Sequence, residues 1–106
     1  MDFTKNLNNI QKNDLANCLD YDTIVGTLRE CRRAPGHAMR LCNGAGTKSL
    51  KKLCQERGVP PGERELLALL RDDAGLAWIE GMGCAHRCRI TEHTTRAIQI
   101  QLTIDS

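Results

Sequence analysis

A regular alternation of apolar and polar side chains near the C-terminus limits the folds open to this chain. The apolar residues are Ile98, Ile100, Leu102 and Ile104, and the polar residues between them are Gln99, Gln101 and Thr103. Successive side chains of a strand point to opposite faces, so a period of two predicts a strand over 97–104 with one buried face. Such a strand needs partner strands and a covering layer, which excludes a purely helical fold.

One segment has the spacing of an amphipathic helix. Leu50, Leu53 and Cys54 stand at positions i, i+3 and i+4 and form a single apolar stripe. The helix is expected over 47–57, with Thr47 as the residue that caps its first turn.

Short apolar runs between turn residues predict further strands. The runs at 66–71 and 76–80 flank an Asp-Asp-Ala-Gly turn and predict a hairpin. Two more short strands are expected at 23–30 and 84–90. We expect the helix to pack its stripe onto one sheet that contains the hairpin and the 97–104 strand.

The predicted class is therefore α+β, with small, mostly antiparallel sheets packed with one main amphipathic helix. The 106 residues fit one small domain, expected over 18–106 after a polar leader or linker at 1–17. No apolar run reaches the roughly 18–20 residues that span a bilayer. The N-terminus lacks the apolar stretch of a signal peptide, so a cytoplasmic protein with no membrane partner is expected.

The six cysteines are expected to be reduced thiols, as is usual in the cytoplasm. A zinc site was considered at Cys84-x-His86-x-Cys88, with His93 beyond it. Structural zinc sites use paired ligands such as C-x-x-C at two places, and this spacing fits them poorly. No metal ligand is predicted.

Positive charge is concentrated in one part of the chain. Residues 29–57 contain eight Lys or Arg and two Glu, a net charge of +6, whereas the whole chain carries +2. A basic block in a nearly neutral protein indicates a surface that faces a polyanion, although a solvated face would have the same composition.

No catalytic set can be assembled from the sequence. Gly44-Ala45-Gly46-Thr47-Lys48 resembles a phosphate loop, but the Walker pattern has four residues between its glycines and Lys directly after the second. A single RNA phosphate at the start of the following helix is a weaker alternative. No nucleophile, base and orienting group occur together, so no catalytic residue is predicted.

Ordered motifs run through most of residues 18–104. They are RRAPGHAMR at 32–40, GTKSLKKL at 46–53, QERGVPPGERE at 55–65, LLRDDAGLAWIEGM at 69–82 and RCRIT at 87–91. In this order they resemble the C-terminal domain of tRNA(Ile)-lysidine synthetases. Three departures stand out: His37-Ala38 replaces Asp-Arg, Leu66 replaces Arg, and Ala85-His86 replaces Asp-Glu.

The resemblance implies a domain that grips tRNA near its acceptor stem. The family's catalytic domain attaches lysine to the wobble cytidine of tRNA(Ile) with ATP and Mg, through an S-G-G-x-D-S loop that this chain does not contain. The chain alone is therefore expected to need no cofactor and to catalyse nothing, and its partner would be tRNA, with a catalytic domain in cis or a second copy as further possibilities. If the chain binds tRNA, the expected contacts are Arg32 and Arg33 at the Pro-Gly turn, Lys48, Lys51 and Lys52 on the helix faces away from the apolar stripe, and Arg64, which matches an arginine of the family motif.

Two other functions stay open at this point. The chain can be a piece of an ATP-dependent RNA-modifying ligase, which an upstream S-G-G-x-D-S segment would reveal. It can also be a protein–protein interaction domain that has lost RNA binding, which a broad exposed apolar patch beside the helix would favour.

The cysteine analysis generates a direct test. A thiol titration of the denatured protein without reductant is expected to find all six cysteines, and metal analysis to find no zinc. One zinc per chain, or fewer than six titratable thiols, would contradict the prediction.

Overall fold

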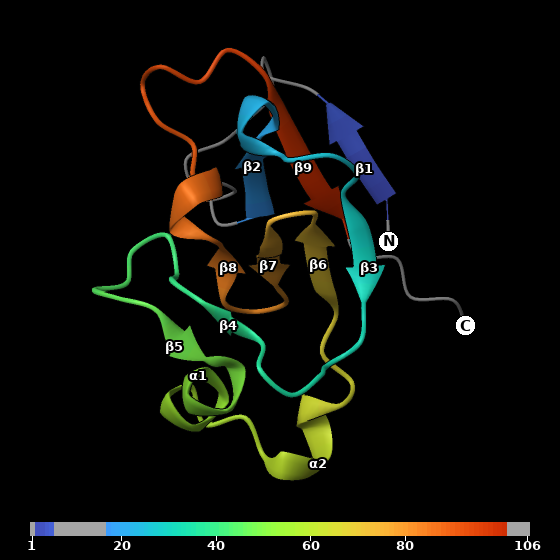
Figure 1. Ribbon diagram of the computed structural model, residues 1–106, viewed down its shortest axis with the longest axis vertical. Coiled ribbons are helices and arrows are strands. Elements are labelled where there is room, and N and C mark those ends of the chain that lie inside the picture. The colour runs from blue at the N-terminus through green and yellow to red at the C-terminus, as the bar shows by residue number, and fades with distance from the viewer. Residues whose placement is uncertain (1, 6–16, 102–106) are drawn as a thin grey trace.

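The computed structural model describes residues 2–5 and 17–101. Its strands form a three-stranded sheet in the order β1-β9-β2, a four-stranded sheet in the order β3-β6-β7-β8, and the two-stranded β4-β5 ribbon. The two helices α1 and α2 lie at one end of the molecule, and the short 3-10 helix η2 at the other (Figure 1). The predicted α+β class is confirmed.

The alternating C-terminal segment is a strand, as predicted. β9 (Ala97–Gln101) is the central strand of its sheet and pairs antiparallel with β1 (Asp2–Lys5) and β2 (Cys18–Asp20). Ile98 and Ile100 are buried, as the period of two requires. Leu102 and Ile104 lie outside the described residues.

The segment expected as a leader or linker contributes a strand to this sheet. Phe3 pairs with Ile100 and Lys5 with Ile98 in the β1–β9 ladder. Residues 6–16 of the same segment lie outside the described part of the chain.

The predicted hairpin is confirmed in the second sheet. β6 (Leu69–Asp72) and β7 (Gly75–Ile79) pair antiparallel across a turn, with a register shift after Leu70. β3 (Arg29–Cys31) and β8 (Gly83–Cys84) flank the hairpin on its two sides. The expectation of one sheet shared with 97–104 was wrong, because β9 is paired on both of its edges by β1 and β2.

The helix is shorter than predicted and begins at a different residue. α1 (Leu50–Glu56) buries Leu50, Leu53 and Cys54, so the predicted stripe is confirmed. The Oγ atom of Ser49, and not Thr47, accepts the Lys52 N–H at 3.1 Å and caps the helix.

A strand pair takes up the residues before the helix. Lys48 and Ser49 form β5 (Lys48–Ser49), which pairs with β4 (Ala38–Met39). After α1, the chain turns through α2 (Pro61–Arg64), which Pro61 opens at a position where its missing N–H costs nothing.

The strands predicted at 23–30 and 84–90 are largely replaced by irregular structure. The first becomes η2 (Tyr21–Thr23), a loop, and then β3; the second becomes β8 followed by the 3-10 helix η3 (His86–Cys88). Each of these segments supplies a hydrogen-bond donor to one buried carboxylate, that of Asp72.

Asp72 is the only polar residue among the buried side chains described, and it is fully covered. Its carboxylate accepts Nη1 and Nη2 of Arg87 at 2.9 and 2.8 Å, the Val25 N–H at 2.9 Å and the Ala74 N–H at 2.8 Å. Burial by itself raises the pKa of Asp72, but the hydrogen bonds from Arg87, Val25 and Ala74 together outweigh it and hold the pKa at about 2. The carboxylate is therefore charged at neutral pH.

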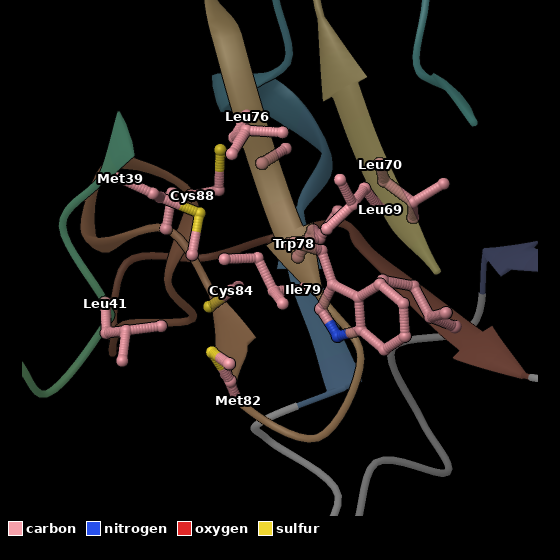
Figure 2. Packing of buried hydrophobic residues seen from close by; sticks show 14 of the residues in the cluster. Met39, Leu41, Leu69, Leu70, Leu76, Trp78, Ile79, Met82, Cys84 and Cys88 are labelled. Carbon is pink, nitrogen blue, oxygen red and sulfur yellow. The ribbon is translucent and has the colours of Figure 1, made fainter. Parts of the chain in front are cut away.

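The core is one cluster of aliphatic, sulfur-containing and indole side chains. Trp78 is 1% exposed and is a core residue. In Figure 2 the sulfur atoms of Met82, Cys84 and Cys88 lie on the side of the cluster nearer Leu41, and the Trp78 indole lies on the opposite side. Polarisable sulfur side chains fill the irregular space that a core with few aromatic residues leaves.

Two further observations concern the described residues as a set. Each of the six cysteines is a thiol, and no disulfide joins any two of them. Within residues 2–5 and 17–101, no helix has the length and apolar character needed to cross a membrane.

The Asp72 cluster generates a stability prediction. Asp72→Ala leaves Arg87 unpaired and the Val25 and Ala74 N–H groups unsatisfied, and is expected to lower the free energy of unfolding in urea by roughly 3 kcal/mol. The neighbouring Asp73→Ala is the matched control: its exposed ion pair with Arg29 should contribute at most about 1 kcal/mol.

The same carboxylate predicts a pH dependence. Because the pKa of Asp72 falls from 3.8 to about 2 on folding, its stabilising contribution is complete above pH 3.8 and is lost as the pH falls towards 2. Urea unfolding across this range should show a steeper loss of stability in the wild type than in Asp72→Ala. Parallel losses in the two proteins would contradict this account.

The observed cap of α1 gives a second test. Ser49→Ala should destabilise the protein by about 1 kcal/mol, because the Lys52 N–H loses its acceptor. Thr47→Ala, the change at the residue that sequence reasoning selected, should leave the urea midpoint unchanged. The reverse order of effects would place the cap at Thr47.

Candidate nucleic-acid interface

A shallow groove of about 530 Å³ lies between the Pro-Gly turn and the start of α1. We call it the turn groove, and its lining consists of Arg33, Ala34, Pro35, Gly36, His37, Ala38, Ser49, Leu50, Lys51 and Glu65. Gly36 has φ +84°, a backbone conformation that side-chain-bearing residues rarely adopt, and this closes the turn. The Leu50 N–H donates to the His37 carbonyl at 2.9 Å and joins the turn to the helix.

Three of the six residues predicted to contact RNA have partners within the protein. Arg33 Nη1 lies 3.4 Å from Glu65 Oε1, and Lys48 Nζ lies 2.7 Å from both carboxylate oxygens of Glu56. The hydrogen bond from Lys48 is the main cause that lowers the pKa of Glu56. Arg64 Nε donates to the Val59 carbonyl at 3.0 Å, so this arginine holds the turn between α1 and α2.

The other three predicted residues project from the surface. Arg32, Lys51 and Lys52 are exposed, and within residues 17–100 no ion pair is found for any of them. Lys51 lines the turn groove, whereas Lys52 stands next to it in the first turn of α1. Of the six predicted residues, two are therefore neutralised by carboxylates, one is bonded to a backbone carbonyl, and three are exposed without an ion pair among the described residues.

A second groove, of about 290 Å³, lies across β4 from the first. We call it the bridge groove, and it is lined by Ala38, Met39, Arg40, Thr47, Ala74, Gly75, Leu76, Ala85, His86 and Arg87. Ala38 lines both grooves, so the β4–β5 ribbon forms the wall between them. The sequence analysis did not select the bridge groove.

Backbone pairing builds this second site from distant parts of the chain. Leu41 and Ala85 form an isolated antiparallel bridge, flanked by the Cys42 N–H to Cys84 carbonyl bond of 2.9 Å and the His86 N–H to Arg40 carbonyl bond of 2.8 Å. Arg40 and His86 are therefore opposite each other, although they are far apart in sequence. This non-local pairing is why sequence reasoning missed the site; the only local signal was the pair of arginines in the RCRIT motif.

The ring of His86 is held in one hydrogen-bonding state. Arg89 Nη1 lies 3.2 Å from His86 Nδ1 and also donates to the His86 carbonyl at 2.9 Å. Because a guanidinium can only donate, Nδ1 accepts and Nε2 carries the ring hydrogen. Desolvation, followed by the positive charges of Arg40 and Arg89, lowers the pKa of His86.

The three residues of the possible zinc site, Cys84, His86 and Cys88, do not lie on the single strand predicted for them. Cys84 ends β8 while His86 and Cys88 lie in η3, so the three do not share one strand face. Burial, followed by the neighbouring Cys42 thiol, raises the pKa of Cys84 to about 12. Among the residues that the structure describes, no three His, Cys, Asp or Glu side chains are grouped as metal ligands.

Part of this chain is similar in sequence to known proteins. A tRNA(Ile)-lysidine synthase from Azoarcus sp. (strain BH72) is 46% identical over 59 residues, which cover 56% of this chain and 13% of the relative. The corresponding synthase from Aromatoleum aromaticum (strain DSM 19018 / LMG 30748 / EbN1) is 42% identical over 57 residues, 54% of this chain and 14% of the relative. The chain thus matches only about one seventh of these relatives' length.

The fold also has a counterpart among solved structures. The "Crystal structure of TILS C-terminal domain" superposes with a TM-score of 0.73 at 22% identity, covering 92% of this chain and 78% of the other. A family model described as "TilS substrate C-terminal domain" matches residues 28–102, a span that includes both grooves, α1, the four-stranded sheet and β9 of the three-stranded sheet. The chain therefore belongs to the TilS substrate C-terminal domain family.

Proposed function

We propose that this chain binds tRNA through phosphate contacts and carries out no catalysis by itself. The observation that carries the proposal is a set of exposed cationic side chains for which no acidic partner is found among the described residues: Lys51 and Lys52 in the first turn of α1, and Arg32, which precedes the groove residue Arg33. Unneutralised cations on one surface attract a polyanion and release its counterions when they bind it.

The choice of tRNA rests on the family. The two relatives are named tRNA(Ile)-lysidine synthases, and this chain matches a small part of each. We therefore propose that the chain holds the tRNA, in the region of the acceptor stem, for a catalytic domain supplied in cis or by a partner. ATP and Mg would belong to that catalytic domain, and this chain would need no cofactor.

The chemistry of duplex RNA agrees with such a surface. An RNA helix hides its base edges in a deep, narrow groove, and proteins read it by shape, phosphates and 2′-hydroxyls. Lysine and arginine side chains on a short helix and a tight turn supply phosphate contacts of this kind. Three of the cations, Arg32, Lys51 and Lys52, can contact a phosphate without first breaking an ion pair. The other two would have to leave their partners, Glu65 for Arg33 and Glu56 for Lys48, to contact a phosphate.

Arg64 has a different proposed role. Its bond to the Val59 carbonyl fixes the chain between the two helices, so it positions the basic end of the molecule.

A protein–protein interaction domain is the second candidate. It would be favoured by a broad apolar patch beside α1, but within residues 17–100 the large exposed hydrophobic side chains are Val25 and Leu66. Val25 lies before β3, and Leu66 lies between α2 and β6. Two separate side chains of this kind are ordinary for a protein surface, so RNA binding is the better-supported function.

The test removes two of the exposed charges. In a tRNA titration at several salt concentrations, Lys51→Ala with Lys52→Ala should weaken binding of every tRNA and reduce the slope of log affinity against log salt by about one to two units. The fold should be unaffected, because both side chains are exposed and the Ser49 cap uses only the Lys52 backbone.

The matched control removes the same amount of positive charge elsewhere. Arg29→Gln with Arg96→Gln alters β3 and the residue before β9, whose side chains pair with Asp73 and Asp22. This control should keep the wild-type salt slope. Wild-type protein with no salt-sensitive tRNA binding would overturn the proposed function, and identical slopes in both double variants would remove α1 from the RNA surface.

A further inference from the structure

The bridge groove differs from the turn groove in how its charges are balanced. Glu65 lines the turn groove beside Arg33, whereas no acidic residue lines the bridge groove. Its basic residues come from two segments that the Leu41–Ala85 bridge joins, namely Arg40 from the first and Arg87 and the neutral His86 from the second.

Two arginines hold charge that the described residues do not neutralise: Arg40, which lines the groove, and Arg89, which lies outside the lining but contacts the His86 ring. Arg87 is paired with the buried carboxylate of Asp72. Arg40 donates through Nε to the Gly44 carbonyl at 3.1 Å, and Arg89 donates to the His86 carbonyl. Both of these acceptors are neutral, and within residues 17–100 neither guanidinium has a carboxylate partner.

His86 adds a directed donor between the two charges. Its Nδ1 atom accepts from Arg89, which leaves Nε2–H as the free donor of a ring that lines the groove. An anion at this point would accept from Nε2–H within the field of the Arg40 and Arg89 charges, both of which act on the His86 ring.

The residues at the bridge are Arg40 and Leu41 on one side and Ala85 and His86 on the other, so no carboxylate stands there. The negative charge that would repel an anion is absent, and His86 offers a hydrogen-bond donor.

We infer that the bridge groove is a binding site for a phosphate group of RNA, held by Arg40, Arg89 and His86. The inference rests on the proposed RNA-binding function and extends it across the β4–β5 ribbon to the face opposite the turn groove. The phosphate can be a diester of the RNA backbone or a terminal monoester, which share the oxygen anion that the three side chains recognise.

Charge reversal at His86 is the sharpest test, with a short RNA hairpin as the probe. His86→Glu restores a carboxylate at the bridge and should weaken binding of the hairpin at least tenfold. His93→Glu introduces the same residue in an exposed loop and is the matched control. Arg40→Gln and Arg89→Gln should each reduce the salt slope by about one unit, the amount for one phosphate contact.

The hairpin is used with a 5′-hydroxyl and with a 5′-monophosphate. If the site holds a terminal phosphate, the monophosphate will bind more tightly to wild-type protein, and His86→Glu will remove the difference. If it holds a backbone diester, both hairpins will bind alike, and both will be weakened by His86→Glu.

A measurement on the unaltered protein guards against variants that fold poorly. The charged groups that face His86 are Arg40, Arg89 and Arg87, the last with Asp72 behind it. A bound phosphate should offset the positive charges of the two unpaired guanidinium groups and so raise the pKa of His86. NMR of the His86 ring protons, with and without the hairpin, measures this change. The ring protons of His93, in the exposed loop, serve as the internal reference.

The outcomes separate this inference from the function on which it rests. Wild-type protein that fails to bind the hairpin in a salt-sensitive way removes the proposed function. Wild-type binding that survives His86→Glu at full strength, with an unchanged pKa of His86 in the complex, overturns the bridge site and leaves the α1 surface in place.

Discussion

The buried carboxylate of Asp72 is the interaction on which most of the local structure depends. A charged group taken out of water is costly unless its hydrogen-bonding capacity is met, and Asp72 meets it from three parts of the chain. Val25 comes from the loop before β3, Ala74 from the hairpin turn, and Arg87 from η3. The requirement to satisfy one carboxylate therefore brings β3, the β6–β7 hairpin and the segment after β8 together.

The position of Arg87 then determines the neighbouring surface. Its guanidinium donates to Asp72 and also to the Gly75 and Leu76 carbonyls, which ties η3 to the β6–β7 hairpin. In the same segment the His86 N–H donates to the Arg40 carbonyl, so His86 lies opposite Arg40. The Arg87–Asp72 ion pair and the candidate phosphate site are therefore adjacent, and loss of the ion pair would disturb the phosphate site.

Charge at the surface has to be read together with the fold. Lys48 and Arg33 look as available in the sequence as Lys51 and Arg32, but carboxylates hold the first two and Arg64 is bound to a backbone carbonyl. Intramolecular partners such as these reduce the field that an approaching polyanion meets. The cations without such partners lie on both sides of the β4–β5 ribbon, which suits a ligand as extended as an RNA helix.

Local patterns in the sequence were enough to predict several elements. The period of two at 98–104 specified β9, the i, i+3, i+4 stripe specified the buried face of α1, and the turn residues at 72–75 specified the β6–β7 hairpin. These features succeed because each depends on neighbouring residues alone. The basic block and the ordered motifs likewise indicated the family and one basic end of the molecule.

The tertiary structure decided every feature that requires contact between residues far apart in the sequence. The partners of β9 come from residues 2–5 and 18–20, and no local pattern states which strands will pair. Residues 23–30 and 84–90 have apolar content suitable for strands, but much of each is irregular or 3-10 structure, and each supplies one donor group to Asp72, the Val25 N–H and the Arg87 guanidinium. The Arg40–His86 pairing is of the same kind. Local propensity is a weak preference, and the free energy of satisfying a buried charge exceeds it, so the sequence determined the strongly periodic elements and the fold determined the sites between them.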